Sequence, residues 1–181
     1  MSEKYKIRDP NALHFITITI VGWVDLFIRR DYKDLVLESL MFCQKEKGLK
    51  IYAWVIMTSH MHLIVSSDSN NLSSIIRDFK TFTSKGLINL IKRIPESRRD
   101  WILKKFAFEA NRNVRAVNYK LWQDGFHPIE LSTNKMMDQR LNYIHYNPVE
   151  AGFVDEPEKY WYSSAVDYSG GKGLLDILFI N

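Results

Sequence analysis

The stretch IYAWVIMTSHMHLIV, residues Ile51–Val65, consists of two apolar runs separated by a short polar turn. Runs rich in Val, Ile, Tyr and Trp are typical of buried strands, so this pattern predicts two neighbouring strands with a tight connection. Side chains alternate between the two faces of a strand, which places His60 and His62 on one face and Met61 on the other. We therefore expect the two imidazoles to point in the same direction.

This histidine pair predicts either a metal site or two hydrogen-bonded side chains beside a turn. Neutral imidazole is a good ligand for divalent metals, and two ligands fixed by a sheet need only one or two more from elsewhere. The His-X-His pattern is short, however, and has many accidental matches. Spacing alone leaves both interpretations open. It disfavours a zinc hydrolase, because no carboxylate or further histidine lies at a supporting spacing.

Length and composition indicate one domain that spans residues 1–181, because a chain of 181 residues with 46% hydrophobic residues can bury a substantial core. No apolar run approaches the roughly 20 residues that a membrane span needs. The segment MSEKYKIRDP is polar and lacks the apolar part of a secretory signal. Cys43 is the single cysteine and lies in a helical pattern, so we expect a buried core residue in a cytoplasmic protein.

Positive charge is concentrated between Arg77 and Lys120. This block has 12 Lys and Arg against 4 Asp and Glu, whereas the rest of the chain has 13 against 17. A basic block interleaved with aromatic residues suits a polyanion whose bases can stack. A solvated helix face with core aromatics is the alternative interpretation. The aromatic residues concerned are Phe79, Phe82, Trp101, Phe106, Phe108 and Tyr119.

Hydrophobic periodicity predicts an alternation of strands and helices. The expected elements are a strand over His14–Val21, a helix from Asp31 to about Lys47, the strand pair of Ile51–Val65, and a helix from Asn71 or Ser73 to about Lys92. Asp31 is the expected N-cap of the first helix, Gly48 its stop, and Pro95 closes the second helix. Strand, helix, two strands and helix make up most of a split β-α-β plan.

The segments that follow are less regular. Glu96 to Asn118 is compatible with a loop, a short helix or a segment that becomes ordered on binding a partner. Tyr119–Trp122 is predicted as a short strand that runs into a turn at Asp124 and Gly125. A tail begins at about residue 156, and its apolar end, Leu174–Ile180, is expected to pack back onto the domain or to pair as an edge strand, with a partner surface as the functional alternative.

A further helix is predicted between Thr133 or Asn134, either of which can cap it, and Pro148, which sets its end. Helical spacing gives a core stripe and a second stripe beside it. Tyr143 and Asn147 lie in the second stripe, one turn apart on the margin of the buried face. The core stripe is Met137, Leu141 and Ile144, and the second stripe is Met136, Arg140, Tyr143 and Asn147.

A tyrosine at this margin suits a chemistry that needs a nucleophile beside a metal. A phenol is a poor nucleophile at neutral pH, but a nearby divalent cation polarises a scissile phosphate and orients it for in-line attack. His60 and His62 would hold the metal, and Asn147 can supply a third, oxygen ligand. Taken alone, Tyr143 is better interpreted as a half-buried aromatic on an amphipathic helix.

Three blocks in this order resemble a known family. AWVIMTSHMHLIV resembles the metal-binding His-hydrophobic-His segment of the single-tyrosine transposases, and KLWQDGFHP with LNYIHYNPVEAGFV resembles the later blocks of their REP-associated branch. The resemblance runs from about Leu13 to Ser164. It implies a HUH endonuclease with an α+β, ferredoxin-like fold, in which helices pack on an antiparallel sheet, and an enzyme that cuts and rejoins single-stranded DNA at hairpin-forming sequences.

The resemblance also implies roles for individual residues. His60 and His62 match the ligands of a divalent metal, Mg²⁺ or Mn²⁺, Tyr143 matches the nucleophile that forms a 5′-phosphotyrosine, and Asn147 matches the third ligand position. Tyr146 is a rival nucleophile, whereas His145 leaves the helix on another side and is not expected to be a ligand. The resemblance further implies that the basic block contacts DNA. The candidate residues for this contact are Arg77, Lys80, Lys85, Arg112, Arg115 and Lys120.

This chain departs from the family pattern at Thr58-Ser59, where relatives commonly have Pro-Asn before the first histidine. Gln123 and Asp124 are expected to support the site or the DNA. The alternative function is a catalytically inactive, domesticated nucleic-acid-binding module. The sequence decides neither between a monomer and a homodimer nor which DNA sequence is recognised.

Overall fold

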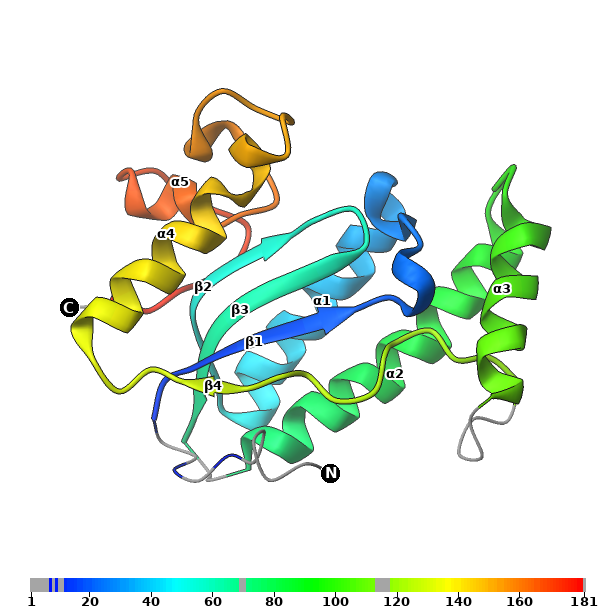
Figure 1. The fold of residues 1–181 in the computed structure, drawn as a ribbon, viewed down its shortest axis with the longest axis horizontal. Coiled ribbons are helices and arrows are strands. Elements are labelled where there is room, and N and C mark those ends of the chain that lie inside the picture. The colour runs from blue at the N-terminus through cyan, green and yellow to red at the C-terminus, as the bar shows by residue number, and fades with distance from the viewer. Residues whose placement is uncertain (1–6, 8, 10–11, 69–70, 113–117, 181) are drawn as a thin grey trace.

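The computed structural model describes residues 7, 9, 12–68, 71–112 and 118–180. Figure 1 shows a central sheet with helices on both sides. The strands are β1 (His14–Thr19), β2 (Leu49–Ile56), β3 (His60–Ser67) and β4 (Ile129–Glu130). The α-helices are α1 (Arg30–Lys47), α2 (Leu72–Arg93), α3 (Arg99–Asn111), α4 (Asn134–Glu150) and α5 (Ala165–Tyr168). Short 3-10 turns are η2 (Val21–Trp23), η3 (Leu26–Ile28) and η4 (Pro157–Lys159).

The sheet has four strands in the order β2-β3-β1-β4, and every neighbouring pair is antiparallel. Helix α1 connects β1 to β2, and α2 follows β3, which is the split β-α-β plan predicted from the sequence. The predicted α+β class with a ferredoxin-like sheet is therefore confirmed. The strand pair of Ile51–Val65 is the β2-β3 hairpin at the centre of this arrangement.

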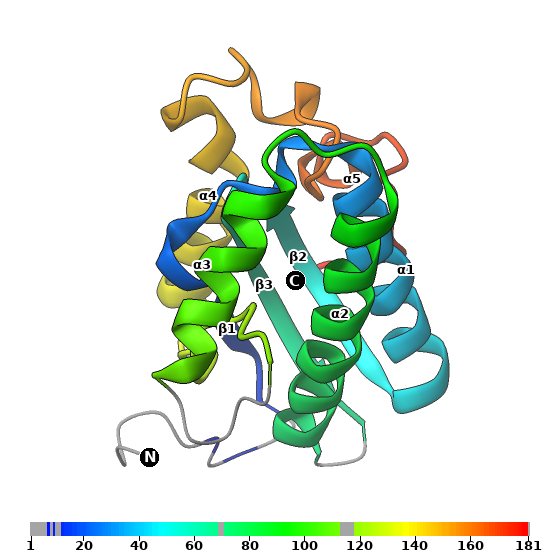
Figure 2. The same cartoon turned by 90° about the vertical axis from the view of Figure 1, so that its right-hand side faces the viewer.

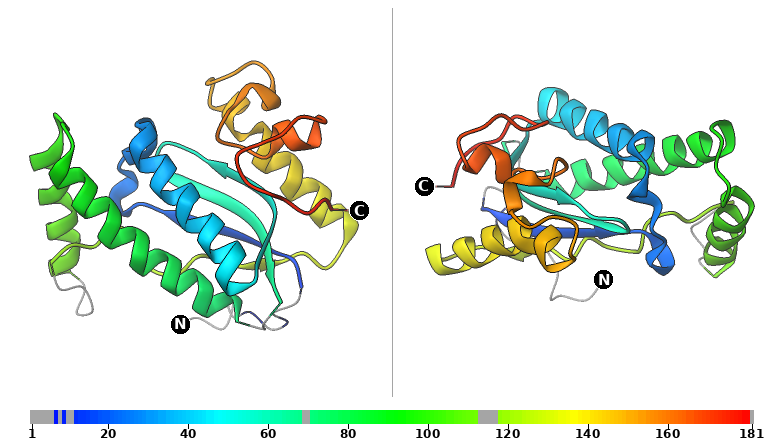
Figure 3. Two further views of the ribbon diagram at one scale, coloured as in Figure 1. Left: turned by 180° about the vertical axis from the view of Figure 1, so that it is seen from behind. Right: turned by 90° about the horizontal axis from the view of Figure 1, so that it is seen from above.

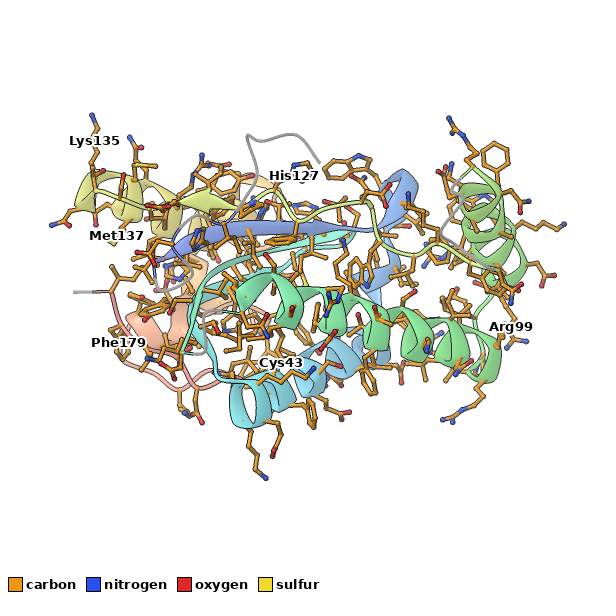
Figure 4. All side chains as sticks on the ribbon, turned by 90° about the horizontal axis from the view of Figure 1, so that it is seen from below. Cys43, Arg99, His127, Lys135, Met137 and Phe179 are labelled. Atoms are coloured by element: carbon orange, nitrogen blue, oxygen red, sulfur yellow. The ribbon has the colours of Figure 1, made fainter. Side chains whose placement is uncertain are left out.

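The two faces of the sheet are covered by different helices. Helices α1 and α2 cover one face, where Ile18, Met61 and Leu63 belong to the larger apolar core. Helix α4 packs on the other face, where its Ile144 joins Phe15 in a smaller cluster. Seen from above, the sheet lies between α1 and α4 (Figure 3). Cys43 is buried in the larger core, as expected (Figure 4).

Helix ends follow the predicted signals in part. Gly48 ends α1 in the left-handed conformation, with φ 69° and its N–H bonded to Cys43 O. Thr133 caps α4 through its hydroxyl, which accepts from the Met136 N–H. Asp31 is not the N-cap of α1 as predicted, because the helix begins one residue earlier and Asp31 lies in its first turn, where an acidic side chain is also favourable.

Pro148 does not end α4, although it was expected to do so. The helix continues to Glu150, and the N–H groups of Ala151 and Phe153 bond to carbonyls of its last turn. A proline in the last turn of a helix removes only one backbone hydrogen bond there, so the helix tolerates it. The consequence for the site is small, because Tyr143 and Asn147 lie in regular helix as predicted.

The segment after α2 confirms one prediction and contradicts another, since a short helix was one of the alternatives for Glu96 to Asn118, whereas the strand expected after it does not form. Residues 99–111 form α3, held by the buried Ile102, Phe106 and Ala110, and Figure 2 shows it standing beside α2. The strand predicted at Tyr119–Trp122 is wrong, since only one isolated bridge, between Ile20 and Trp122, forms there. The fourth strand is instead Ile129–Glu130, where the chain pairs with β1.

The C-terminal tail packs back onto the domain, as one of its predicted alternatives proposed. Leu175 is buried, and the Leu178 N–H bonds to Ile51 O at 2.9 Å along the edge of β2. Ser163 bridges to Val55 on the same strand. None of the helices in the described part of the chain has the length and apolar character required to cross a bilayer.

Candidate active site

His60 and His62 project from β3 on the α4 side of the sheet. Strand register places His60 opposite Thr19 and His62 opposite Thr17, while Met61 between them enters the α1 and α2 core. The two imidazole ring centroids are 4.8 Å apart. The sequence prediction that both histidines share one face is confirmed.

Each imidazole is held at Nδ1 by a hydroxyl group. Thr17 Oγ1 lies 2.9 Å from His62 Nδ1, and Ser59 Oγ lies 3.2 Å from His60 Nδ1. Hydrogen bonding of one ring nitrogen fixes the ring and leaves the other nitrogen for a ligand, which is the usual arrangement around metal-binding histidines. Here both Nδ1 atoms are engaged, so the Nε2 atoms are the ones directed to a ligand.

Burial keeps both imidazoles neutral. It lowers the pKa of His62 to about 3, with further contributions from the neighbouring His60 and from the Arg140 guanidinium. Burial also lowers the pKa of His60. Neutral imidazole is the metal-binding form, and its lone pair is available at neutral pH. The donor set therefore fits a divalent metal in its charge state and its orientation.

Tyr143 reaches the histidine pair from α4. Its hydroxyl oxygen lies 3.5 Å from His62 Nε2, and the two rings meet edge to face with centroids 5.1 Å apart. Ile144, the next residue, is fully buried and anchors this part of the helix to the sheet. Phe15 of β1 stacks on His62 with a 5.3 Å centroid separation and meets the Tyr143 ring edge to face. The phenol remains 38% exposed, so a substrate can approach it.

The other predicted residues of α4 behave differently from one another. Asn147 is half-buried, one helical turn beyond Tyr143, and makes no side-chain hydrogen bond to either histidine in the described structure. Tyr146 is 51% exposed, and no ring contact joins it to His60 or His62 among the described residues. His145 is buried on another side of the helix and bonds through Nε2 to Ser164 Oγ at 3.0 Å.

No cluster of three or more His, Cys, Asp or Glu side chains that could hold a metal occurs within the described ranges. A metal at His60 and His62 would therefore take its remaining ligands from an amide or hydroxyl group, from solvent or from a substrate phosphate. The Asn147 amide is the candidate that the sequence provides. Oxygen donors of this kind, beside two imidazoles, suit Mg²⁺ or Mn²⁺.

Arg140 is a site residue to which sequence reasoning assigned no role. Its guanidinium carbon lies 4.8 Å from the centroid of the Phe15 ring, and its charge contributes to the lowered pKa of His62. The signal was present in the sequence, since Arg140 precedes Tyr143 by three residues in the same stripe of the helix.

The basic residues of α2 do not gather at the histidines. Arg77 and Lys85 lie on the helix that covers the opposite face of the sheet, and Lys85 lines a groove between α1 and α2. Lys80 points instead to the chain that runs along β1, where its ammonium donates to Gln123 O at 2.7 Å and to Gly125 O. Burial lowers the pKa of Lys80 to about 8.

The remaining predicted DNA contacts lie in and after α3. Lys120 forms an ion pair with Asp124 at 2.7 Å, and its side chain is 17% exposed. Arg112 is exposed and stacks over Phe108 at 5.7 Å. Arg115 lies outside the described residues. Gln123, whose role was open, bonds through its backbone N–H to Thr19 O, on the residue opposite His60.

Only some aromatic residues of the basic block can meet a ligand. Phe79 and Phe106 are buried in the larger core, whereas Trp101 and Phe108 are more than half exposed. Trp23, outside the block, was not anticipated as a site residue. It is 61% exposed, and its ring meets His60 edge to face at 5.4 Å.

Comparisons with known proteins show the family and agree with the fold. A solved REP-associated tyrosine transposase bound to a REP hairpin matches with a TM-score of 0.64 and 19% identity, over 100% of this chain and 96% of that chain. A candidate transposase from Deinococcus radiodurans has a TM-score of 0.43 and 13% identity, over 74% of this chain and 88% of that chain. The comparison with curated proteins found no match. The family model for IS200-like transposases matches residues 13–147, which is most of the sequence, and the chain therefore belongs to the IS200-like transposase family.

Proposed function

We propose that this transposase cuts and rejoins single-stranded DNA at hairpin-forming sequences, with Tyr143 as the nucleophile and His60 and His62 as ligands of Mg²⁺ or Mn²⁺. The observation that carries the proposal is the 3.5 Å separation between the Tyr143 hydroxyl and His62 Nε2. A nucleophile and a pair of neutral imidazoles within one small site match a phosphoryl transfer that needs both.

The proposed reaction is an exchange of phosphodiester bonds. The Tyr143 oxygen attacks the scissile phosphorus, a Tyr–O–P bond forms, and the bond from phosphorus to the 3′-oxygen breaks. The phenol proton is balanced by the proton that the departing 3′-oxygen takes up. The products are a 5′-phosphotyrosine and a fragment with a free 3′-hydroxyl, so attack by such a hydroxyl reverses the step and rejoins a strand.

Each residue of the site has a part in this scheme. Thr17 and Ser59 orient the imidazoles through their hydrogen bonds to Nδ1. When bound, a divalent ion supplies Lewis-acid polarisation of the phosphate. Asn147 is the proposed third ligand. Arg140, beside Phe15 on the same face, is placed to neutralise phosphate charge and to hold the strand across the site.

Two further features support a hairpin DNA substrate and a site within one chain. The solved structure with the same fold is described as bound to a REP hairpin, and we extend that substrate class to this chain. Tyr143 and His62 of the same chain are in contact, so the proposed site needs no residue from a second copy. A homodimer is compatible with this arrangement but is not required by it.

The test is the formation of a covalent protein–DNA adduct. Labelled single-stranded hairpins are incubated with the protein and Mg²⁺ or Mn²⁺, and a slowly migrating, denaturant-resistant band is expected that chelation with EDTA prevents. Tyr143→Phe is expected to remove the adduct, whereas the control Tyr146→Phe is expected to keep it. An adduct that persists in Tyr143→Phe contradicts the assignment of the nucleophile.

The alternative is an inactive nucleic-acid-binding module, which the same experiment separates from the proposal. Salt-sensitive binding of the hairpins without any adduct, under every metal condition, would favour the module. Both functions require a surface that binds nucleic acid, but only the enzyme requires the phenol beside the imidazoles.

A further inference from the structure

Trp23 occupies an unusual position beside the histidine pair. It has φ 55°, a left-handed conformation that is rare for a bulky residue, and it directly follows Gly22, which has φ 62°. These two residues turn the chain as it leaves β1, and the turn leaves the indole 61% exposed with its centroid 5.4 Å from the His60 ring. An exposed indole in a strained turn gains little from burial, so a ligand is the simplest reason for its placement.

The turn is joined to helix α3 by a close contact. The Lys105 side chain crosses directly over Gly22, and a Cβ at Gly22 would lie 2.5 Å from Lys105 Cε. Only glycine allows this approach without displacing the lysine. The turn at Gly22 and Trp23 therefore lies against α3, through a side chain that belongs to the exposed surface of that helix.

That surface of α3 alternates aromatic and cationic side chains. Trp101, Lys105, Phe108 and Arg112 follow at intervals of four, three and four residues, which places them in one stripe along the helix. The Lys105 ammonium lies 5.8 Å from the Phe108 ring centroid, and the Arg112 guanidinium lies 5.7 Å from it on the same ring. Trp101 and Phe108 are 54% and 56% exposed.

Two acidic side chains near this face are engaged with cations. Glu109 lies 3.2 Å from Lys105, and Asp25, two residues after Trp23, lies 2.7 Å from Arg98. Arg112 and Lys104 are exposed and add positive charge to α3. The face therefore presents aromatic rings with cationic side chains between them, although Asp100, beside Trp101 in the first turn of α3, is an exposed acidic side chain.

We infer that Trp23 is a stacking platform for a DNA base next to the scissile phosphate, and that the stripe Trp101, Lys105, Phe108 and Arg112 carries the single strand onward from it. The inference rests on the proposed function and adds a base-binding subsite to it. Exposed aromatic rings with interspersed cations are the combination that binds single strands without reading their sequence. Contact of Trp23 with His60 places this face next to the chemistry, which favours DNA over a protein partner.

The test measures binding, so that it does not depend on cleavage. Full-length protein without added metal is titrated with the fluorescently labelled oligonucleotide (dT)12 and with an abasic chain of equal length and charge. Trp23→Ala is expected to weaken binding of (dT)12 by about five- to tenfold, the lower range for loss of one stacked base, and to leave binding of the abasic chain unchanged. Trp23→Phe, which retains a ring, is expected to keep most of the affinity.

The control is Trp161→Ala, because Trp161 is 58% exposed but lies in the C-terminal tail. It is expected to bind both probes as the wild type does. Intrinsic tryptophan fluorescence provides a second readout, since quenching by (dT)12 should fall in Trp23→Phe and not in Trp161→Phe. A Trp23→Ala variant that is unchanged toward (dT)12, or equally weakened toward both probes, overturns the inference.

The outcome is separable from that of the proposed function. Base-dependent binding through Trp23 without any covalent adduct would sustain the subsite and reject the nuclease. An adduct that forms at an unchanged rate in Trp23→Ala, together with unchanged (dT)12 affinity, would sustain the nuclease and reject the subsite. A wild-type protein that binds (dT)12 no better than the abasic chain rejects the subsite directly.

Discussion

The two faces of the central sheet are built from the same strands but have different compositions. Toward α1 and α2, β1 and β3 present mainly apolar side chains, and the buried His14 at the start of β1 and Ser67 at the end of β3 are the polar exceptions. Toward α4, the same strands present the hydroxyls and imidazoles of the site. The first set is Ile16, Ile18, Ile20, Met61, Leu63 and Val65, and the second includes Thr17, Thr19, His60 and His62.

This difference shows how one pair of strands can separate stability from chemistry. Because the side-chain period of a strand is two, every second residue can be selected for packing without constraining the residues between. The larger core then holds the backbone of β3 in place. The side chains of the polar face are attached to the same backbone, so their positions are fixed as well. A site built on a packed sheet is positioned more accurately than one built on loops.

The largest effect is expected from removing one of the two proposed metal ligands on the polar face. His62→Ala should lower single-turnover cleavage of a DNA hairpin by roughly a thousandfold or more, because loss of a bound metal removes several kcal/mol of transition-state stabilisation. Mn²⁺ binding, measured by calorimetry, should be lost together with activity, while the far-UV circular dichroism should stay native.

His145→Ala is the matched control, because His145 is a buried histidine of α4 that bonds to Ser164 and not to the histidine pair. It should retain Mn²⁺ binding. Normal metal binding by His62→Ala would show that the polar face is not a metal site. The two faces of the sheet would then differ only in how their side chains pack.

The next largest effect is expected on the apolar face. Phe79→Ala in α2 should lower the free energy of unfolding by about 3–5 kcal/mol, because Phe79 is fully buried in the larger core. Urea denaturation measures this change. Phe82→Ala, three residues along the same helix at a side chain that is 66% exposed, should change stability by only about 0.5 kcal/mol or less.

Metal affinity provides the second half of that experiment. Folded Phe79→Ala protein should bind Mn²⁺ as the wild type does, since the substitution touches no residue of the polar face. If Phe79→Ala and Phe82→Ala lower the free energy of unfolding equally, α2 is not packed as the structure describes.

A smaller effect is expected when His62 keeps its imidazole but loses the hydrogen bond that orients the ring. Thr17→Val should weaken Mn²⁺ binding by about tenfold, since it removes the 2.9 Å hydrogen bond to His62 Nδ1 while nearly preserving volume. Thr19→Val is its control, on the same strand and face, because Thr19 makes no hydrogen bond to a histidine among the described residues. Equal affinities of the two variants would indicate that the hydroxyl at Thr17 does not orient the ring.

Features set by local periodicity could be predicted from the sequence. The β2-β3 hairpin, the shared face of the histidines and the end of α1 at Gly48 all follow from patterns within a few residues. Docking of α4 on the histidine face depends on contacts between distant segments, so the helical pattern allows it as one hypothesis and only the family resemblance implies it. The 3.5 Å contact between the Tyr143 hydroxyl and His62 Nε2 could therefore not be predicted from residue spacing within β3 or within α4.

The features that were missed depend on contacts between distant segments. Helix α3 was left open because its three buried residues are separated by charges, and the strand predicted at residues 119–122 lacks a partner beyond one bridge. Trp23 carries no local signal at all. Its exposure depends on the left-handed conformations of Gly22 and Trp23, and the residue that packs against Gly22, Lys105, is far away in sequence.

Lys80 provides a test at the boundary between the two faces of the sheet. It was predicted to contact DNA, yet its ammonium donates to Gln123 O and Gly125 O, and so ties α2 to the segment that runs beside β1. Burial lowers its pKa to about 8 from an ordinary value of 10.5. Below pH 8 both the folded and the unfolded protein hold this proton. Burial of the charged ammonium then lowers the stability of the folded state by its full amount.

Between about pH 8 and pH 10.5 the folded protein releases the Lys80 proton while the unfolded chain still holds it, so the unfolded state binds more protons. The free energy of unfolding of the wild type should therefore rise with pH relative to that of Lys80→Met. The rise should not exceed about 1.4 kcal/mol per pH unit, the limit for one linked proton. Urea denaturation of both proteins at pH 7.5, 8.5 and 9.5 measures the difference, with Lys104→Met, an exposed lysine of α3, as the control. If the Lys80→Met and wild-type curves instead stay parallel across this range while DNA affinity falls, Lys80 contacts phosphate and the buried contact to the two carbonyls is not its role.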